Sequence, residues 1–295
     1  MAENFLLHYN EGIWLEKIPA PLNTLQLFIT NKCNLRCQGC FYRHKLGQTE
    51  MSLEQYQAYL EKYLPQIQKV ILLGGEPTLH PQLPQIIALN QERGIKTTIY
   101  SNGFNLRPLE KINLDLVKIR VGVYGAQQSE KPLAKVTPTE LPLTIVYMLR
   151  QDNISELAAT AELAEKEYNC QDFYISSIRD IAATDNYWLD TAETIPVSNY
   201  AKIIQNFVDN YQGQIKRLHL ATRGVIITKN NDFTSVNRCR FGNIFPDQEK
   251  IICPLDISKK LTTNELSFDE RACTKHYKCI LQKIILEKIT YANTK

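Results

Sequence analysis

Hydrophobic and polar positions follow a regular pattern through the first two-thirds of the chain, in which short apolar runs are separated by longer segments with helical spacing. The apolar runs predict six strands, at residues 24–30, 69–75, 95–103, 116–125, 141–149 and 172–178. The longer segments predict helices at residues 52–64, 81–94, 154–168 and 197–211, with Ser52 as the cap of the first. Strands that alternate with helices form a parallel sheet with right-handed connections. We therefore expect an α/β fold.

Three short polar motifs directly follow the first three predicted strands. They are CNLRCQGC at residues 33–40, GGEP at 74–77 and SNG at 101–103. In parallel sheets and barrels the active site lies at the carboxyl ends of the strands. We expect the sheet to be open or curled into a partial TIM-like (β/α)6 barrel, with the three motifs gathered at one mouth.

After about residue 213 the alternation stops. Residues 244–254, IFPDQEKIICP, predict two short strands joined by a polar turn, and the last four cysteines of the chain fall in this region. We therefore expect an N-terminal extension at residues 1–23, a core at 24–212 and a small Cys-rich C-terminal subdomain at 213–295.

Composition and charge exclude few functions, but they indicate the partners and the cellular location to expect. The chain is 44% hydrophobic and 22% charged, with a formal net charge of +3, which does not favour nucleic-acid or membrane partners. The N-terminus lacks the features of a signal peptide, and no apolar run reaches the length of a membrane span. We expect a cytoplasmic protein, in which eight cysteines indicate metal or redox chemistry.

Three cysteines are crowded into the first motif, namely Cys33, Cys37 and Cys40. Thiolates are soft ligands that select zinc, copper(I) and iron–sulfur clusters. Four cysteines normally hold a cubane cluster, so three leave one iron open, as in catalytic metal sites. A zinc site is the alternative, but the missing fourth ligand nearby and the GGEP motif weigh against it.

The spacing Cys33-x3-Cys37-x2-Cys40, followed by GGEP and SNG, resembles the radical SAM enzymes over roughly residues 24–180. The resemblance implies a [4Fe-4S] cluster whose open iron binds S-adenosylmethionine. It also implies an external electron donor, because the reduced cluster cleaves the cofactor to a 5′-deoxyadenosyl radical that abstracts a substrate hydrogen. In such enzymes the protein positions and shields the cofactor.

The resemblance also assigns cofactor contacts to the second and third motifs. Gly74 and Gly75 would let the backbone approach a ligand closely. Glu76 would accept hydrogen bonds from the ammonium of the methionine moiety. Ser101 and Asn102 stand where the family carries (S/T)NG.

Some positions depart from the family pattern. Gly39 stands where an aromatic residue is usual before the third cysteine, so Gly39 keeps a backbone contact and adenine stacking shifts to Tyr42. The fourth strand reads VGVYG instead of V-S-x-D-G, which makes Tyr124 a speculative catalytic residue and a core tyrosine the alternative. Arg150 is a candidate partner for the cofactor carboxylate, with a surface arginine as the alternative.

A second, looser set of cysteines comprises Cys239, Cys253, Cys273 and Cys279. The segment CRFGNIFPDQEKIICP at residues 239–254 resembles the hairpin of the SPASM and twitch extensions of radical SAM enzymes. The resemblance implies one auxiliary [4Fe-4S] cluster; structural zinc and unligated thiols are the alternatives. His276 could replace one ligand or lie on the surface. Cys170 belongs to neither set and is expected to be a buried structural thiol.

The auxiliary cysteines indicate the peptide-modifying branch of the family. Our leading hypothesis is modification of a ribosomally made precursor peptide by epimerisation, crosslinking or backbone cleavage. Only 32 residues precede Cys33, so we expect direct peptide binding at the mouth or a separate leader-recognition protein. A small metabolite or a tRNA nucleoside is the alternative substrate, although the modest charge argues against RNA. A non-catalytic metal-binding protein is the alternative of another class.

Overall fold

The computed structural model describes residues 3–8, 12–17, 23–37, 40, 42–127 and 129–177. Towards the C-terminus it describes residues 203, 206–207, 210–213, 218–220, 225–227, 233–235, 238–239, 241–247, 250–251 and 271–272. Within this part of the chain, no helix combines the length and the apolar character needed to cross a bilayer.

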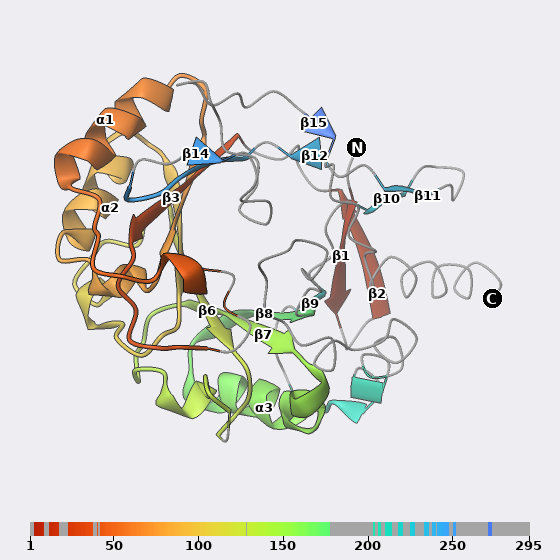
Figure 1. Ribbon diagram of the computed structural model, residues 1–295. Coiled ribbons are helices and arrows are strands. Elements are labelled where there is room, and N and C mark those ends of the chain that lie inside the picture. Colours follow the sequence, from red (N-terminus) through yellow and green to blue (C-terminus); the bar gives the residue numbers. More distant parts are fainter. Residues whose placement is uncertain are drawn as a thin grey trace.

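A curved sheet of parallel strands forms the centre of the molecule (Figure 1). The six predicted strands are confirmed as β3 (Thr24–Thr30), β4 (Lys69–Gly74), β5 (Lys96–Ser101), β6 (Val117–Val123), β7 (Leu143–Leu149) and β8 (Cys170–Ser177). Each pairs in parallel with the next one along the chain. The sheet therefore follows chain order, as expected for a partial (β/α)6 barrel.

Helices lie on the outer side of the curved sheet (Figure 1). They are α1 (Leu53–Tyr63), α2 (Leu83–Glu92) and α3 (Leu157–Glu167), with short 3-10 turns η1 (Arg43–Lys45), η2 (Pro77–Leu79), η3 (Arg107–Leu109), η4 (Leu133–Lys135) and η5 (Gln151–Glu156). Ser52 caps α1 as predicted, because its hydroxyl accepts from the Gln55 N–H at 3.2 Å. The predicted helix at 197–211 falls mostly outside the described residues, although residues 203, 206–207 and 210 are helical.

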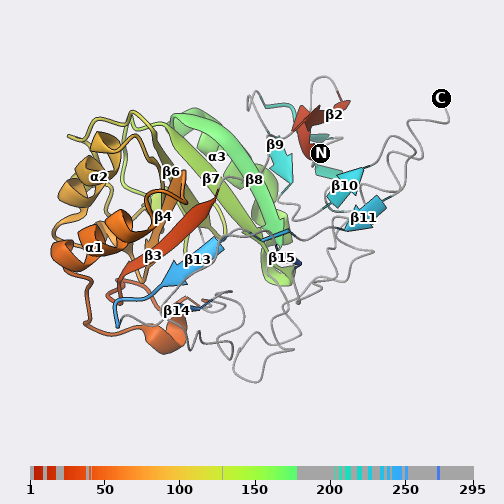
Figure 2. The same cartoon turned by 90° about the horizontal axis from the view of Figure 1, so that it is seen from above.

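The sheet extends beyond the predicted six strands on both edges. β13 (Phe241–Ile244) joins β3 in parallel and β14 (Lys250–Ile251) pairs antiparallel with β13, which confirms two short strands in this region; the expected run began at residue 244. Figure 2 shows β13 beside β3. On the other edge β9 (Leu218–Leu220) follows β8, then β1 (Glu3–His8) and β2 (Gly12–Lys17).

Four further short strands form two separate ribbons. β10 (Val225–Ile227) pairs with β11 (Phe233–Ser235), and β12 (Arg238–Cys239) pairs with β15 (Arg271–Ala272). The 11-stranded sheet thus takes strands from all three expected parts of the chain. The boundaries at residues 23 and 213 stay predictions.

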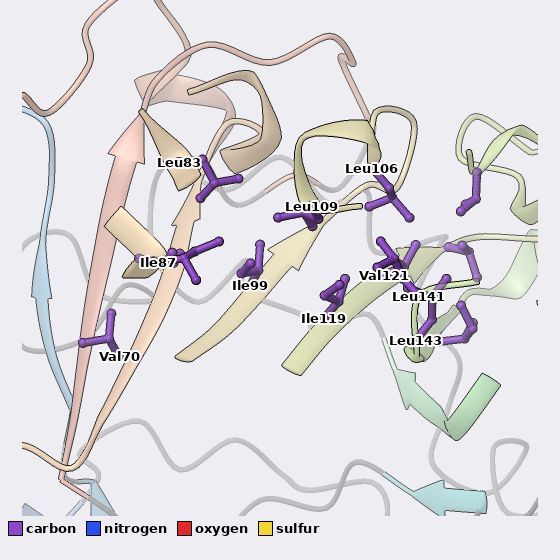
Figure 3. Close-up of a cluster of buried hydrophobic side chains, with 14 of the residues drawn as sticks. Val70, Leu83, Ile87, Ile99, Leu106, Leu109, Ile119, Val121, Leu141 and Leu143 are labelled. Carbon is purple, nitrogen blue, oxygen red and sulfur yellow. The ribbon is translucent and has the colours of Figure 1, made fainter. Parts of the chain in front are cut away.

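The two faces of the sheet have different chemistry because successive side chains point to opposite sides of a strand. The face towards the helices is a large apolar core, and Figure 3 shows part of it, with Ile99 near Ile87 of α2 and, further along the sheet, Val121 and Leu143 near Leu141. The opposite, inner face of β6 carries Lys118, Arg120 and Gly122. This polar inner face leads up to the mouth where the sequence motifs lie.

Candidate functional site

The three predicted motifs meet at the carboxyl ends of β3, β4 and β5. Cys33, Cys37 and Cys40 lie in the loop between β3 and η1, and each is half-buried and free of any disulfide. The Cys40 N–H donates to the Cys37 carbonyl at 3.3 Å, which turns the end of the loop back on itself. The three thiols therefore come from one compact loop at the mouth.

The paired glycines of GGEP lie directly against this cysteine loop. The Gly75 N–H donates to the Thr30 carbonyl at 2.8 Å, and a Cβ on Gly75 would lie 2.1 Å from the Lys32 carbonyl oxygen and 2.9 Å from the Cys33 Cβ. Gly74 has a φ of +151°, and its Cβ would lie 2.2 Å from the Thr30 oxygen. We expected these glycines to admit a ligand, and the close contact in the structure is with the loop.

The Glu76 carboxylate joins the second and third motifs. Its Oε1 accepts from the Ser101 hydroxyl at 2.7 Å and from the Thr78 hydroxyl and N–H at 2.8 and 3.1 Å. Its Oε2 accepts from the Asn102 N–H at 2.6 Å. Glu76 is buried, so these four donors satisfy a carboxylate that burial would otherwise penalise. Its contact to a cofactor ammonium stays a prediction.

Asn102 closes the link to the cysteine loop. Its side-chain Nδ2 donates to the Asn34 Oδ1 at 2.6 Å, and its Oδ1 accepts from the Phe104 N–H at 2.9 Å. The Ser101 hydroxyl accepts from the Gly103 N–H at 2.9 Å. The SNG motif is thus held by its own hydrogen bonds, and it bridges β5 to the loop after β3.

Tyr42 lies in an aromatic cluster, which we define as Phe28, Tyr42 and Phe245. The Tyr42 ring stacks on Phe28 at 4.9 Å and on Phe245 at 5.8 Å, and its hydroxyl donates to the Asn31 Oδ1 at 2.5 Å. Only 2% of the Tyr42 side chain is exposed. Adenine stacking on Tyr42 stays a prediction, and it would require one of these rings to move.

Tyr124 and Arg150 form a second buried polar group near the mouth. The Arg150 guanidinium lies 5.4 Å from the Tyr124 ring centroid and binds both oxygens of Asp152 at 2.9 and 2.7 Å. Glu130 lies 3.5 Å from Arg150 Nη1. Two carboxylates thus balance the Arg150 charge, and its contact to a cofactor carboxylate stays a prediction.

The phenol of Tyr124 stays protonated at neutral pH. Burial raises its pKa, the nearby Cys37, Cys40 and Glu130 raise it further, and Arg150 lowers it. The catalytic role of Tyr124 and the alternative of a core tyrosine both stay predictions, although its charge interactions with Cys37 and Cys40 place it near the cysteine loop.

The electrostatics of the cysteine loop involve a lysine that sequence reasoning missed. Burial raises the pKa of Cys33 and Cys40, and raises that of Cys37 to about 11, while the Lys131 charge lowers all three. Lys131 Nζ lies 3.1 Å from the position that a Cβ on Gly122 would take. In the fourth strand, Gly122 therefore makes room for a cation instead of supplying a hydroxyl.

Three thiols from one loop beside a cation are a donor set that an iron–sulfur cluster can use. Among the described residues, no group of three or more His, Cys, Asp and Glu side chains converges tightly enough for one ion. A cubane cluster carries its thiolates on separate irons and needs them further apart. The three thiols with a neighbouring cation suit such a polynuclear, negatively charged centre.

Three of the four cysteines of the second set lie outside the described residues, namely Cys253, Cys273 and Cys279. Gly39 and His276 also lie outside them. Cys239 ends β12, and its backbone pairs with Arg271 of β15. The backbone at Cys239 therefore lies beside the strand that immediately precedes position 273 in sequence. An auxiliary cluster stays a prediction.

Other polar residues of the inner face were also missed, namely Tyr100, Arg120 and Tyr174. The signal was present in the sequence KIRVGVYG, where Lys118, Arg120, Gly122 and Tyr124 alternate with apolar residues. Strict alternation marks a strand with one apolar and one polar face. The run was interpreted only as a strand, and its alternation, which marks Arg120, was not used.

The fold and site define a parallel α/β partial barrel with a three-cysteine loop at its mouth. Residues 27–129 match the profile of the radical SAM superfamily. Such a match implies a [4Fe-4S] cluster and S-adenosylmethionine.

Two curated relatives extend the comparison. A PqqA peptide cyclase from Methylorubrum extorquens (strain PA1) is 29% identical over 174 residues, covering 52% of this chain and 45% of the relative. A GTP 3′,8-cyclase from Aquifex aeolicus is 28% identical over 129 residues, covering 40% of each. The chain spans about half the length, or less, of these relatives.

Among solved structures, SuiB of Streptococcus suis bound to its precursor peptide SuiA superposes with a TM-score of 0.59. The match covers 88% of this chain and 64% of SuiB, at 13% identity. At this identity the likeness shows the fold alone, and it confirms the partial-barrel architecture.

Proposed function

We propose that this protein is a radical SAM enzyme that modifies a ribosomally made precursor peptide. Cys33, Cys37 and Cys40 would hold a [4Fe-4S] cluster, and S-adenosylmethionine would bind at the open iron. When bound, the two together supply a radical that abstracts a substrate hydrogen. The chain's own residues hold the loop, bind the cofactor and keep water from the mouth.

One observation carries the proposal: a continuous hydrogen-bonded path joins the three motifs. Glu76 accepts from Ser101 and from the Asn102 N–H, and Asn102 donates to Asn34 in the cysteine loop. A path of buried hydrogen bonds fixes the loop relative to β4 and β5. Such preorganisation suits a site that must hold a reactive cofactor in one position.

The peptide substrate is supported by two likenesses. The chain is similar to a peptide cyclase and shares its fold with a protein solved with a precursor peptide bound. The likeness to GTP 3′,8-cyclase supports the second candidate, a small metabolite. A single auxiliary [4Fe-4S] cluster on Cys239, Cys253, Cys273 and Cys279, an external electron donor, a separate leader-recognition protein and a cytoplasmic location complete the proposal.

Anaerobic reconstitution of the full chain tests the chemistry. We expect about eight irons per chain and release of 5′-deoxyadenosine after reduction, because two cubane clusters hold four irons each. Cys37→Ala should lose about four irons and abolish release, whereas Cys253→Ala should lose about four irons and keep some uncoupled release. Zinc in place of iron, with no release, would refute the proposal.

Cys170→Ala is the matched control. Cys170 lies at the start of β8, opposite the mouth, and burial raises its pKa to about 12. Iron content and 5′-deoxyadenosine release in this variant should therefore match the wild type.

Transfer of deuterium from a labelled peptide into 5′-deoxyadenosine distinguishes a peptide substrate from a metabolite substrate. Absence of transfer from every peptide tried would favour the metabolite.

A further inference from the structure

The inner face of the sheet carries a row of polar side chains below the mouth. Tyr100, Arg120, Thr144 and Asp172 are register partners on β5, β6, β7 and β8. These four strands are neighbours in the curved sheet (Figure 1). Such a row is unusual in a barrel interior, which apolar side chains ordinarily fill.

Arg120 is held between two aromatic rings. Its guanidinium carbon lies 4.9 Å from the ring centroid of Tyr100 and 4.6 Å from that of Tyr174. Arg120 Nη1 donates to the Tyr100 hydroxyl at 3.0 Å. Stacking on both sides fixes the plane of the guanidinium, so its remaining donors point in defined directions.

A further donor of Arg120 lacks a partner within the part of the chain that the structure describes. Arg120 Nε is buried and makes no hydrogen bond, and the hydrogen bond recorded for the guanidinium comes from Nη1. A buried donor without an acceptor destabilises the fold, so an acceptor that reached this group would bind favourably. The Nε and Nη2 groups form one edge of the guanidinium, and this is the edge that a carboxylate can accept in bidentate fashion.

Positive charge is in excess around this row. Asp172 is the buried acid there, and Lys118 already pairs with its Oδ2 at 2.9 Å. Among the described residues, no carboxylate forms an ion pair with Arg120. The same cations act on the neighbouring Lys69. Burial and the charges of Arg120, Lys118 and Lys96 lower its pKa to about 8.

The row lies close to the mouth. Arg120 precedes Gly122 by two residues on β6, which is about 7 Å along a strand. Gly122 faces Lys131, whose charge acts on all three cysteines of the loop. Arg120 therefore lies on the inner face of β6, two positions below the glycine that faces Lys131.

We propose that Arg120, held between Tyr100 and Tyr174, binds a carboxylate side chain of the peptide substrate. The proposal rests on the proposed function and specifies its substrate as a peptide with an Asp or Glu next to the modified residue. A planar bidentate partner matches the open edge of the guanidinium better than a neutral amide does, since an amide offers only one acceptor oxygen.

Peptide binding tests the proposal without radical chemistry. The probes are two fluorescein-labelled peptides of Ala and Gly with blocked termini, which differ only in a central Glu or Gln. Fluorescence anisotropy with the reconstituted full chain should show a preference for the Glu peptide of about tenfold or more, as expected for a charge-assisted pair. Equal affinity for the two peptides would overturn the proposal.

Variants assign the preference to Arg120. Arg120→Gln should reduce it to below about twofold, and Arg120→Lys should leave a partial preference of about threefold, since it keeps the charge but loses the planar fork. Arg107→Gln changes an exposed arginine on η3 and should keep the full preference. Circular dichroism melts identify any variant that fails to fold. If Arg120→Gln fails to fold, the Glu preference of Arg120→Lys tests the proposal in its place. Retention of the full preference in Arg120→Lys would refute the bidentate geometry.

Two further arms separate the possible causes. Free glutarate should displace the Glu peptide at lower concentration than inorganic phosphate does; equal displacement would mean a general anion site and overturn the carboxylate assignment. Cofactor cleavage is measured separately on the same preparation. Cleavage without a Glu preference would refute this inference and leave the proposed function intact, whereas a Glu preference without cleavage would refute the proposed function alone.

Discussion

The Glu76 carboxylate accepts a 2.6 Å hydrogen bond from the Asn102 backbone N–H, and this bond ties the end of β4 to the end of β5. The other Glu76 oxygen accepts from Ser101 and Thr78. Glu76 is therefore a structural element of the mouth before any ligand binds. This has a direct consequence for mutagenesis of the GGEP motif.

Glu76→Gln should destabilise the chain even without cluster or cofactor. The substitution places an amide NH₂ against groups that are themselves donors, and a buried unsatisfied donor costs about 1–3 kcal/mol. Urea unfolding of the cluster-free chain measures this loss. Glu110→Gln changes an exposed glutamate and should remain within about 0.5 kcal/mol of the wild type. Equal stability of the two variants would contradict the role assigned to Glu76.

Gly75→Ala should prevent cluster assembly at the cysteine loop. Its Cβ would lie 2.1 Å from the Lys32 carbonyl oxygen, so the loop backbone must shift. After reconstitution, the iron content should fall by about four per chain, the loss expected of Cys37→Ala.

Gly47→Ala is the control for this change, because its Cβ would meet only the Lys45 oxygen, at an ordinary 3.9 Å. The iron content of this variant should equal that of the wild type. Full iron content in Gly75→Ala would show that the loop adjusts without losing its ligands.

The six core strands were predicted well because each is a short run rich in apolar residues, and the first three end in polar motifs. The six core strands and the meeting of the three motifs follow from parallel connectivity alone. Strands β1, β2 and β9 of the same sheet were not predicted. β9 has three residues, too few for any periodic signal.

The roles of single residues in the site were harder to predict, because they depend on contacts between distant segments. Tyr42 was expected beside the cofactor, and the structure packs it against Phe245, about two hundred positions further along. Lys131 lies outside every recognised motif, and only the absence of a side chain at Gly122 gives its ammonium room. Motif spacing carries no information on either contact.

Phe245→Ala should loosen the C-terminal hairpin from the loop that follows the third cysteine. Phe245 stacks on Phe28 at 4.4 Å and on Tyr42 at 5.8 Å, and it is 2% exposed. Removing a buried phenyl ring typically costs about 3–5 kcal/mol. Urea unfolding should show a loss in this range.

Asp247→Asn is the matched change on the same hairpin. It removes the half-exposed ion pair of Asp247 with Lys45, at 2.8 Å, which contributes about 1 kcal/mol or less. A comparable loss in both variants would indicate that charge, and not ring stacking, attaches the hairpin to the core.

Lys69 gives the clearest pH dependence. Its pKa is lowered from 10.5 to about 8 by burial and by the neighbouring cations Arg120, Lys118 and Lys96. Between pH 8 and 10.5 the unfolded chain binds this proton and the folded chain does not, so stability from this group rises with pH through that window. Lys69→Met should increase the free energy of unfolding at pH 7 by about 1–2 kcal/mol, since a shift of one pKa unit corresponds to about 1.4 kcal/mol and partial exposure reduces the effect.

Lys69→Met should also flatten the rise in the free energy of unfolding between pH 8 and 10. Urea unfolding at several pH values measures this rise. Lys111→Met is the control at an exposed position, and it should change neither the free energy of unfolding at pH 7 nor its rise with pH. A steeper rise in Lys69→Met than in the wild type would contradict the crowding of cations on the inner face.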